Sequence, residues 1–497
     1  MQSKRDQVQA HLFLMSRLTS GMLRANPDDL ETPGGRTGKG MTYGLLVAVF
    51  ALVVAALWGL FSPGTPSTWR TEGTLVLEKG TGNRYVYSDG RLRPLLNHAS
   101  ALLLLGSAPT TTTVAPSATR SAPHGPAIGI PGAPDHLPAP ADLVTDAWRL
   151  CSSVTTETSG RTVVRTRLAL GTGSTGRPLG AREGLLLQGP DGRIWLVWAG
   201  ERFLLDAATG ARTALGYGSA APRPVSDAFL GALPAGPDLR APGVPGRGSP
   251  GPDLDGLPTR IGQLFAVRAP GGETRYHLLR REGLVPLDAT RAALVLGDPA
   301  TRSLAHAGRP PTVRPLGTDA VQGHLAPLVV RTGGEGTPAA PPRLVEPSDD
   351  SQPCAVVRPS DGKGMGVSVS LAPDHVPEDH VTVPPADRVV PACLPVDRIE
   401  IPPGRGALVQ ALSSVGTQMG DTVFLVTDAG VRYPVASAQA LAALGYTGAD
   451  VRGLPSGLLM TLPTGVTLDP EVAGRAPAAA EAPPRRTCPG LAQLPAR

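Results

Sequence analysis

The longest uninterrupted apolar stretch of the chain runs from Met41 to Phe61. It contains no charged residue, and as a helix it spans about 31 Å, enough for one crossing of the hydrocarbon core. Aromatic residues at its far end suit the membrane interface. The stretch therefore predicts an uncleaved, single-pass transmembrane helix. Positions along this anchor are Met41, Leu45, Val49, Val53, Leu57 and Phe61.

Two other structures can produce an apolar run near an N-terminus. A buried core helix rarely reaches this length without a charge. A cleaved signal peptide usually has a shorter apolar region, of about 7–15 residues, and no A-x-A site follows the run at Ser62-Pro63-Gly64. Arg36 and Lys39 precede the run, and the next basic residue is Arg70. The positive-inside rule then predicts a cytoplasmic N-terminus and an extracytoplasmic remainder.

The segment before the anchor has an apolar stripe at helical spacing, from Lys4 to Leu23. Arg5, Arg17 and Arg24 lie around this stripe. Such an amphipathic helix can lie on a membrane or dock on a partner protein, whereas a solvated tail is the alternative. We interpret it as a partner-binding helix with Arg5 and the stripe residues Val8, Leu12, Met15, Leu18 and Met22.

A pattern of alternating apolar strands recurs four times after the anchor. Each copy has an apolar strand, a turn with glycine, a second strand with an aromatic residue, and a short helix. The uneven spacing argues against a solenoid and favours small lobes around another domain. The first strands lie at 73–78, 184–188, 264–267 and 422–426, and the helices at 95–106, 225–233, 289–297 and 436–445.

Two further segments, Trp148–Gly171 and Pro353–Ala411, contain alternating strand patterns and predict a central β-rich domain. The chain has four cysteines, all after the anchor, and outside the cytosol at least one disulfide is expected. We favour a bridge between Cys151 and Cys354, because it would link the starts of both central segments. Cys393 and Cys488 remain as the second, weaker pair.

Composition adds linkers and excludes one class of ligand. Gly 61 and Pro 54 among 497 residues indicate many turns, and four stretches are expected to lack secondary structure. The net charge of +5 comes from dispersed arginines, with no basic run between aromatics, so no nucleic-acid partner is predicted. The four expected linkers are Ser107–Ala127, Pro234–Pro258, Arg331–Gln352 and Arg475–Arg497.

Candidate chemistry is sparse. A P-loop needs G-x-x-x-x-G-K-[ST], and both Gly38-Lys39-Gly40 and Gly362-Lys363-Gly364 lack the Ser or Thr, so we interpret both as flexible turns. No G-x-S-x-G nucleophile turn is present. His375 and His380 could bind a metal, but Pro377 between them breaks a helix, and a solvated loop is favoured. No catalytic residue, metal ligand or cofactor is predicted.

Several short motifs together resemble a known family. The motifs are Ser3-Lys4-Arg5-Asp6-Gln7-Val8-Gln9-Ala10-His11, Arg17-Leu18-Thr19-Ser20, Asn83-Arg84-Tyr85-Val86-Tyr87, Gly90-Arg91-Leu92-Arg93-Pro94, Gly129-Ile130-Pro131-Gly132-Ala133-Pro134, Trp148 with Cys151, Gly430-Val431-Arg432-Tyr433-Pro434-Val435, Ala443-Leu444-Gly445-Tyr446 and Leu462-Pro463-Thr464-Gly465. With this ordered set, which covers roughly residues 1–472, the chain resembles EccB, a membrane component of the actinobacterial type VII (ESX) secretion system.

The resemblance implies an α+β fold: a single transmembrane helix and an elongated extracytoplasmic domain, with a disulfide-tied, β-rich central domain and four small repeat domains of β-hairpin and helix. The expected divisions are a cytoplasmic helix and linker (1–40), the transmembrane helix (41–61), repeat 1 (62–135), the first segment of the central domain (136–180), repeat 2 (181–245), repeat 3 (258–330), the second segment of the central domain (346–415), repeat 4 (416–474) and a Pro/Arg-rich tail (475–497).

The function implied is that of a structural, non-enzymatic scaffold in a secretion complex of the inner (plasma) membrane. Its implied partners are an EccC-like ATPase, an EccD-like polytopic membrane protein, an EccE-like component and a second copy of the chain. Some family members carry an ATPase label, which the missing P-loop puts in doubt here. The alternatives are an extracytoplasmic nucleotide hydrolase and a cell-wall-binding module.

Overall fold

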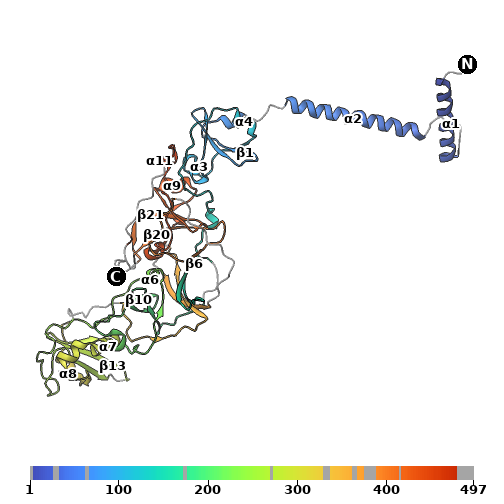
Figure 1. Ribbon diagram of the computed structural model, residues 1–497. Coiled ribbons are helices and arrows are strands. Elements are labelled where there is room, and N and C mark those ends of the chain that lie inside the picture. Colours follow the sequence, from blue (N-terminus) through green and yellow to red (C-terminus); the bar gives the residue numbers. More distant parts are fainter. Residues whose placement is uncertain are drawn as a thin grey trace.

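The computed structural model describes residues 4–25, 33–61, 67–171, 176–268, 272–327, 336–360, 366–373, 388–413, 416–477 and 488. Two helices, α1 (Lys4–Arg24) and α2 (Pro33–Phe61), precede an elongated body of β-sheets and short helices (Figure 1). Helix α2 begins before the expected Met41, since Pro33 suits the first turn of a helix. The mixed α+β class expected from the sequence is confirmed.

The described residues form five sheets, and four of them share one strand order. In each, three antiparallel strands follow one another, a helix comes next, and a fourth strand pairs parallel to the first strand. A second short helix follows the fourth strand. We call these sheets with their helices units 1 to 4.

Units 1 and 2 consist of the following elements. Unit 1 has β1 (Leu75–Glu78), β2 (Arg84–Ser88), β3 (Arg91–Pro94), α3 (His98–Leu105), β4 (Thr111–Val114) and α4 (Pro116–Arg120), preceded by the 3-10 turn η1 (Ser67–Arg70). Unit 2 has β8 (Glu183–Gln188), β9 (Ile194–Trp198), β10 (Glu201–Leu204), α5 (Ala211–Ala214), β11 (Arg223–Pro224) and α6 (Asp227–Ala232).

Units 3 and 4 repeat the arrangement. Unit 3 has β12 (Leu264–Arg268), β13 (Thr274–Arg280), β14 (Gly283–Leu287), α7 (Ala289–Gly297), the π-helix η3 (Thr301–Ala305), β15 (Val313–Pro315) and α8 (Thr318–Gln322). Unit 4 has β20 (Ala407–Leu412), β21 (Gln418–Val426), β22 (Arg432–Val435), α9 (Ala438–Ala443), η4 (Gly448–Asp450), β23 (Arg452–Pro455) and α10 (Ser456–Leu459), followed by α11 (Pro470–Ala473).

The fifth sheet is the central one, with the order β19-β6-β5-β17-β18-β7. Its two long hairpins come from the segments that the alternating pattern indicated, and β5 pairs with β17 so that Cys151 faces Cys354. Residues about 200 positions apart are therefore neighbours, as expected. The strands are β5 (Trp148–Thr156), β6 (Thr162–Leu170), β7 (Arg177–Pro178), β17 (Ser351–Arg358), β18 (Gly366–Pro373) and β19 (Arg398–Glu400), with η2 (Pro140–Asp142) before them.

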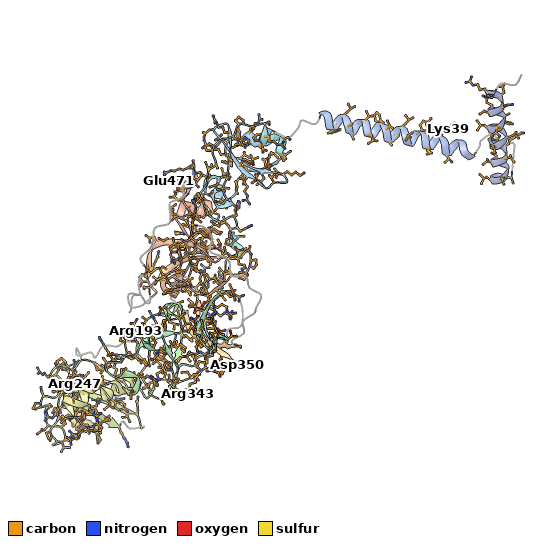
Figure 2. The ribbon with its side chains drawn as sticks, in the orientation of Figure 1. Lys39, Arg193, Arg247, Arg343, Asp350 and Glu471 are labelled. Carbon is orange, nitrogen blue, oxygen red and sulfur yellow. A yellow bond between two sulfur atoms is a disulfide. The ribbon has the colours of Figure 1, made fainter. Side chains whose placement is uncertain are left out.

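Shared cores show the order of the units along the body. One core joins the central sheet to units 2 and 4, another joins units 1 and 4, and unit 3 has a core of its own that meets unit 2 between α5 and α7. The body thus runs from unit 1 through unit 4 and the central sheet with unit 2 to unit 3 (Figure 1). In Figure 2, Glu471 of α11 lies near the unit 1 end and Arg247 lies at the opposite end.

Two of the four expected copies differ in their elements. In the fourth, the expected hairpin is formed by the second and third strands, and β20, expected in the central segment, is the first strand of unit 4. In the second, the expected helix is the second helix α6, and the short α5 occupies the first position. Ser226 caps α6 by accepting a hydrogen bond from the Phe229 amide, whereas Gly210 before α5 offers no side-chain cap.

Two stretches expected to be linkers contain strands. Ser107–Ala127 includes β4 and α4, and Arg331–Gln352 includes β16 (Arg343–Leu344), which pairs with β8, and the start of β17. In the first stretch, the threonines of β4 favour extended structure, and the parallel pairing of β4 with β1 outweighs the Pro- and Ala-rich composition. Pro234–Pro258 contains only isolated bridges.

Candidate functional site

The apolar stripe expected on the N-terminal helix is present on α1. Its residues Val8, Leu12, Met15, Leu18 and Met22 are all more than half exposed. Phe13 and Leu14 lie off the stripe and are also exposed, which the stripe pattern did not indicate. A shallow hollow on α1 is lined by Leu14, Arg17, Leu18, Gly21 and Met22, and an exposed apolar helix of this kind is stabilised by a membrane or partner.

Helix α2 carries the predicted anchor. Thr37–Trp58 is long and apolar enough to cross a membrane, and its side chains lack the protein neighbours that a buried core helix would have. Gly38-Lys39-Gly40, expected as a flexible turn, lies inside this helix instead. The amides of a helix interior are already hydrogen-bonded, so this segment offers no phosphate cradle.

Two disulfides tie distant segments of the body. The sulfur atoms of Cys151 and Cys354 lie 2.06 Å apart on neighbouring central strands, and those of Cys393 and Cys488 lie 2.08 Å apart. The first bridge is buried and closes a loop that contains all of units 2 and 3. It holds the outgoing and returning strands of the central sheet together.

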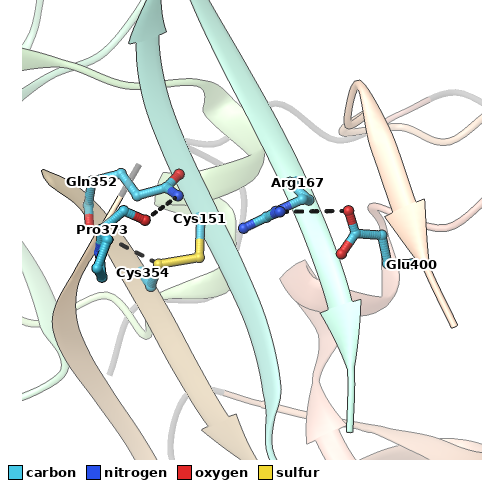
Figure 3. Close-up of a disulfide and its surroundings, with 6 residues drawn as sticks. All are labelled: Cys151, Arg167, Gln352, Cys354, Pro373 and Glu400. Carbon is cyan, nitrogen blue, oxygen red and sulfur yellow. Dashed lines mark hydrogen bonds and ion pairs between the residues drawn. A yellow bond between two sulfur atoms is a disulfide. The ribbon is translucent and has the colours of Figure 1, made fainter. Parts of the chain in front are cut away.

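The face of the central sheet that bears the first disulfide is charged (Figure 3). Arg167 is in register with Cys151 on one side and with Arg398 on the other. The Glu400 carboxylate lies 3.6 Å from Arg167 Nη1 and 3.1 Å from Arg398 Nε. Burial, together with the charge of Arg167, lowers the pKa of the nearby Arg149 guanidinium. This cluster connects β5, β6 and β19.

Each unit ends with the same backbone contact. After the second helix the chain runs beside the third strand, and there an amide of that strand donates to a carbonyl of the passing segment. The donors are Leu92, Arg202, Leu284 and Arg432, and the acceptors are Pro123, Pro234, His324 and Pro463. In units 2 and 4, Gly236 and Gly465 lie so close to Phe203 and Tyr433 that a Cβ would collide with the ring.

Two of these donors are buried arginines, which the sequence pattern did not reveal. The Arg202 guanidinium lies 5.0 Å from the ring centroid of Trp195, and that of Arg432 lies 5.0 Å from Phe424. Burial lowers the pKa of Arg202 to about 10, and burial raises the pKa of Asp227 nearby. Both pairs belong to the units that pack on the central sheet, so they stabilise the middle of the body.

Unit 1 rests on unit 4 through a mixed interface. The Tyr446 hydroxyl of unit 4 donates at 2.7 Å to the carbonyl oxygen of Pro138, in the segment that leads from unit 1 to the central sheet, and burial raises the pKa of this phenol. Ala99, Leu102 and Leu103 of α3 share a core with Leu441 and Leu444 of unit 4. Helix α11, the last described helix, also contacts α3, so the chain returns next to unit 1.

The remaining sequence candidates add no reaction centre. His375, His380 and Gly362-Lys363-Gly364 lie outside the described residues. Among the residues that the structure describes, no group of three His, Cys, Asp or Glu side chains could hold a metal ion. What the arrangement offers is a membrane helix, an exposed amphipathic helix and a long body with several exposed surfaces.

Comparison with known proteins identifies this arrangement. A family model described as "Type VII secretion system ESX-1, transport TM domain B" matches residues 1–479. The chain is 32% identical to the ESX-3 secretion system ATPase EccB3 of Mycolicibacterium smegmatis over 459 residues, covering 89% of this chain and 85% of that protein. It is 28% identical to the ESX-1 secretion system ATPase EccB1 of Mycobacterium tuberculosis, covering 89% of this chain and 88% of that protein.

Solved structures show the same fold. A chain of an intact ESX-5 inner membrane complex matches with a TM-score of 0.62 and 25% identity, covering 98% of both chains. A chain of the EccB3 dimer from the ESX-3 core complex matches with a TM-score of 0.62 and 28% identity, covering 81% of this chain and all of that one. Both are parts of membrane assemblies.

Proposed function

The chain belongs to the EccB family of type VII (ESX) secretion membrane components, and we propose that within such a complex it acts as a non-enzymatic scaffold for the extracytoplasmic part. The observation that carries this proposal is the body itself. Four like units and a central sheet are joined end to end by shared cores behind one membrane helix. A long, disulfide-tied body of this kind can hold several partners at fixed distances.

The proposed orientation places α1 in the cytoplasm and the body outside. Arg36 and Lys39 precede the apolar run, and the first basic residue after it is Arg70. Basic residues are retained on the cytoplasmic side. The disulfides are compatible with this orientation, because an oxidising compartment preserves them.

The proposed partners act on both sides of the membrane. On the cytoplasmic side, the exposed stripe of α1 docks on an EccC-like ATPase or an EccD-like polytopic protein, and an EccE-like component completes the assembly. A second copy of the chain binds through the body. The similarity to a chain of an EccB3 dimer supports the self-association.

A mild-detergent purification of the tagged full-length chain, followed by mass spectrometry, tests the proposal. We expect an FtsK-like ATPase and a polytopic membrane protein to be recovered with it. The double variant Leu12→Glu/Leu18→Glu should lose these partners, because it places charge on the apolar stripe. The matched control Gln9→Glu adds charge to α1 away from the stripe and should retain them. Recovery of the chain alone would contradict the scaffold.

The same preparation separates the scaffold from the two alternative functions. The names of the curated relatives contain the word ATPase, and the scaffold instead places ATP hydrolysis in a partner. The purified chain should therefore release no phosphate from ATP above a boiled control. It should also remain in the supernatant when purified peptidoglycan is sedimented. Turnover or co-sedimentation would favour the corresponding alternative.

A further inference from the structure

The fourth strand of every unit is a sheet edge, and three of the four edges are protected. The first strand presents Leu187, Phe265 and Val409 at one equivalent register position in units 2, 3 and 4. Opposite them the fourth strands carry Arg223, Arg314 and Arg452. Charges on an edge strand discourage pairing with another chain.

The next position along the fourth strand continues this protection. Units 2 and 3 have Pro224 and Pro315 there, and proline cannot donate to a further strand. Unit 4 has Gly453, whose amide and carbonyl are both bonded to Ser360. Each of these three edges is thus closed by a charge together with a proline or a backbone bridge.

Unit 1 lacks all of these devices. Opposite Val76 and Leu77 its fourth strand β4 carries Thr112 and Thr113, and the strand contains neither charge nor proline. The turn η1 lies beside β4. Within the described residues, however, no backbone hydrogen bond joins β4 to anything except the β1 side. A β-branched, uncharged edge of this kind is prone to pair with other strands unless something covers it.

Two threonine side chains of this edge lie on its exposed face, and the Thr111 hydroxyl donates a hydrogen bond to the Pro109 carbonyl oxygen at 3.1 Å. Thr111 and Thr113 are exposed, whereas Val114 on the other face is buried in the core of unit 1. Pro109 and Pro116 flank the run, and no charged residue occurs from Ser107 to Thr119. Ser- and Thr-rich segments with proline are a typical substrate of O-glycosylation outside the cytoplasm.

We propose that Thr111 and Thr113 are O-glycosylated, and that the sugars close the one fourth-strand edge that side-chain chemistry leaves open among the four described units. The Thr Oγ1 atom attacks the anomeric carbon of a polyprenyl-phosphate-linked hexose, and a carboxylate of the transferase takes the hydroxyl proton. The new carbon–oxygen bond replaces the bond to phosphate, and polyprenyl phosphate leaves with the electron pair. The inference rests on the extracytoplasmic placement of the body proposed above.

Peptide mass spectrometry of the full-length chain tests it. The chain is purified from an actinobacterial host and from a host without protein O-glycosyltransferases. We expect the tryptic peptide 92–120 from the first host to carry whole-hexose increments, located by fragmentation on Thr111 or Thr113, and the peptide from the second host to be bare. The isosteric variant Thr111→Val/Thr113→Val should lose the increments from those positions.

Thr162 and Thr274 serve as internal controls, because both are exposed strand residues that are not flanked by prolines on both sides. Equal modification of these two would overturn the assignment to the open edge. External protease on spheroplasts reports the placement of the body independently. A bare peptide from a chain that retains its partners and is cut from outside overturns the glycosylation alone. A bare peptide from a protected body overturns the proposed orientation as well.

Discussion

Units 2 and 4 differ from units 1 and 3 at one position of the third strand, although all four units share one strand order. The third strand carries Arg202 and Arg432 in the first pair, and Leu92 and Leu284 in the second. In all four units the amide of this residue makes the same hydrogen bond to the passing chain. The backbone contact is therefore common to all four units. The side chain at this position divides them into two classes, units 2 and 4 with arginine and units 1 and 3 with leucine.

The difference follows the place of each unit in the body. Units 2 and 4 contribute to the core around the central sheet, whereas units 1 and 3 form the two ends of the body (Figure 1). On the second strand, the residue diagonally across from this position, two before the residue in direct register, is aromatic or histidine in every unit: Tyr85, Trp195, His277 and Phe424. Among the residues that the structure describes, an arginine lies over this ring in the middle units alone. The same type of sheet thus occurs in two places. We call units 2 and 4, which pack on the central sheet, inner pillars, and units 1 and 3, at the ends of the body, end lobes.

The largest expected effect comes from truncating an aromatic residue in each class. Phe229 and Phe265 are both fully buried, the first in the shared core and the second in the core of unit 3. Each change to alanine should cost about 3–5 kcal/mol of unfolding free energy. Phe229→Ala should destabilise the central sheet and units 2 and 4 together, and Phe265→Ala should affect unit 3 alone. Hydrogen exchange resolves the regions, and identical patterns would contradict the distinction.

The buried arginine gives the next largest effect. Arg202 is 2% exposed, and its Nε and Nη1 atoms have no hydrogen-bond partner among the described residues. Arg202→Ala should cost about 2–3 kcal/mol, because a cavity replaces the side chain and the contact with Trp195 is lost. Arg202→Leu, which copies units 1 and 3, should stay within about 1 kcal/mol of the parent. Denaturant titration compares them, and an equal loss in both variants would show that the charge itself is required.

Lowering the pH should destabilise unit 3 more than the middle of the body. Burial lowers the pKa of His277 below its ordinary value of 6.5, and the side chain is 7% exposed. The neutral folded form is then fully favoured above pH 6.5, and stability is lost as the pH falls below that value. Each unit of pKa difference is worth about 1.4 kcal/mol. Exchange protection in unit 3 at pH 7.5 and 5, corrected for intrinsic exchange, measures this. His277→Phe, which copies unit 4, should reduce the extra loss and leave the part due to His306, whose pKa burial also lowers.

The smallest effect is expected for a surface ion pair of unit 1. Arg84 Nη1 lies 2.8 Å from the Asp135 carboxylate, with both side chains at least one-third exposed. Asp135→Ala should change the unfolding free energy by about 0.5 kcal/mol or less, since water and salt screen exposed charges. Thermal unfolding measures this change. A loss of free energy beyond that range would indicate that Asp135 also holds α3 in place, since the first amide of α3 donates to its carboxylate.

Local patterns predicted much of this fold. The apolar run indicated α2, the stripe indicated α1, and the alternating segments indicated β5, β6, β17 and β18. Pairing of Cys151 with Cys354 also follows from those segments. These features depend on residues close in sequence, or on two segments with the same period.

The remaining features depend on pairing between distant segments. The fourth strands are two to four residues long, too short for a periodic signal, and they form because the first strand offers a parallel partner. For the same reason β20 could not be assigned to unit 4 from its own residues. The contacts of the buried arginines could not be predicted either, because they have no common spacing in the sequence. Trp195 and Arg202 are closer in sequence than Phe424 and Arg432.

Hydrogen-exchange mass spectrometry of the full-length chain in mild detergent, at increasing denaturant, tests the two-class account most directly. We predict that the central sheet and units 2 and 4 open in one cooperative step, and that unit 3 opens separately at lower denaturant. If unit 3 opened together with the central sheet, or if unit 2 or unit 4 opened apart from it, the division into inner pillars and end lobes would be wrong.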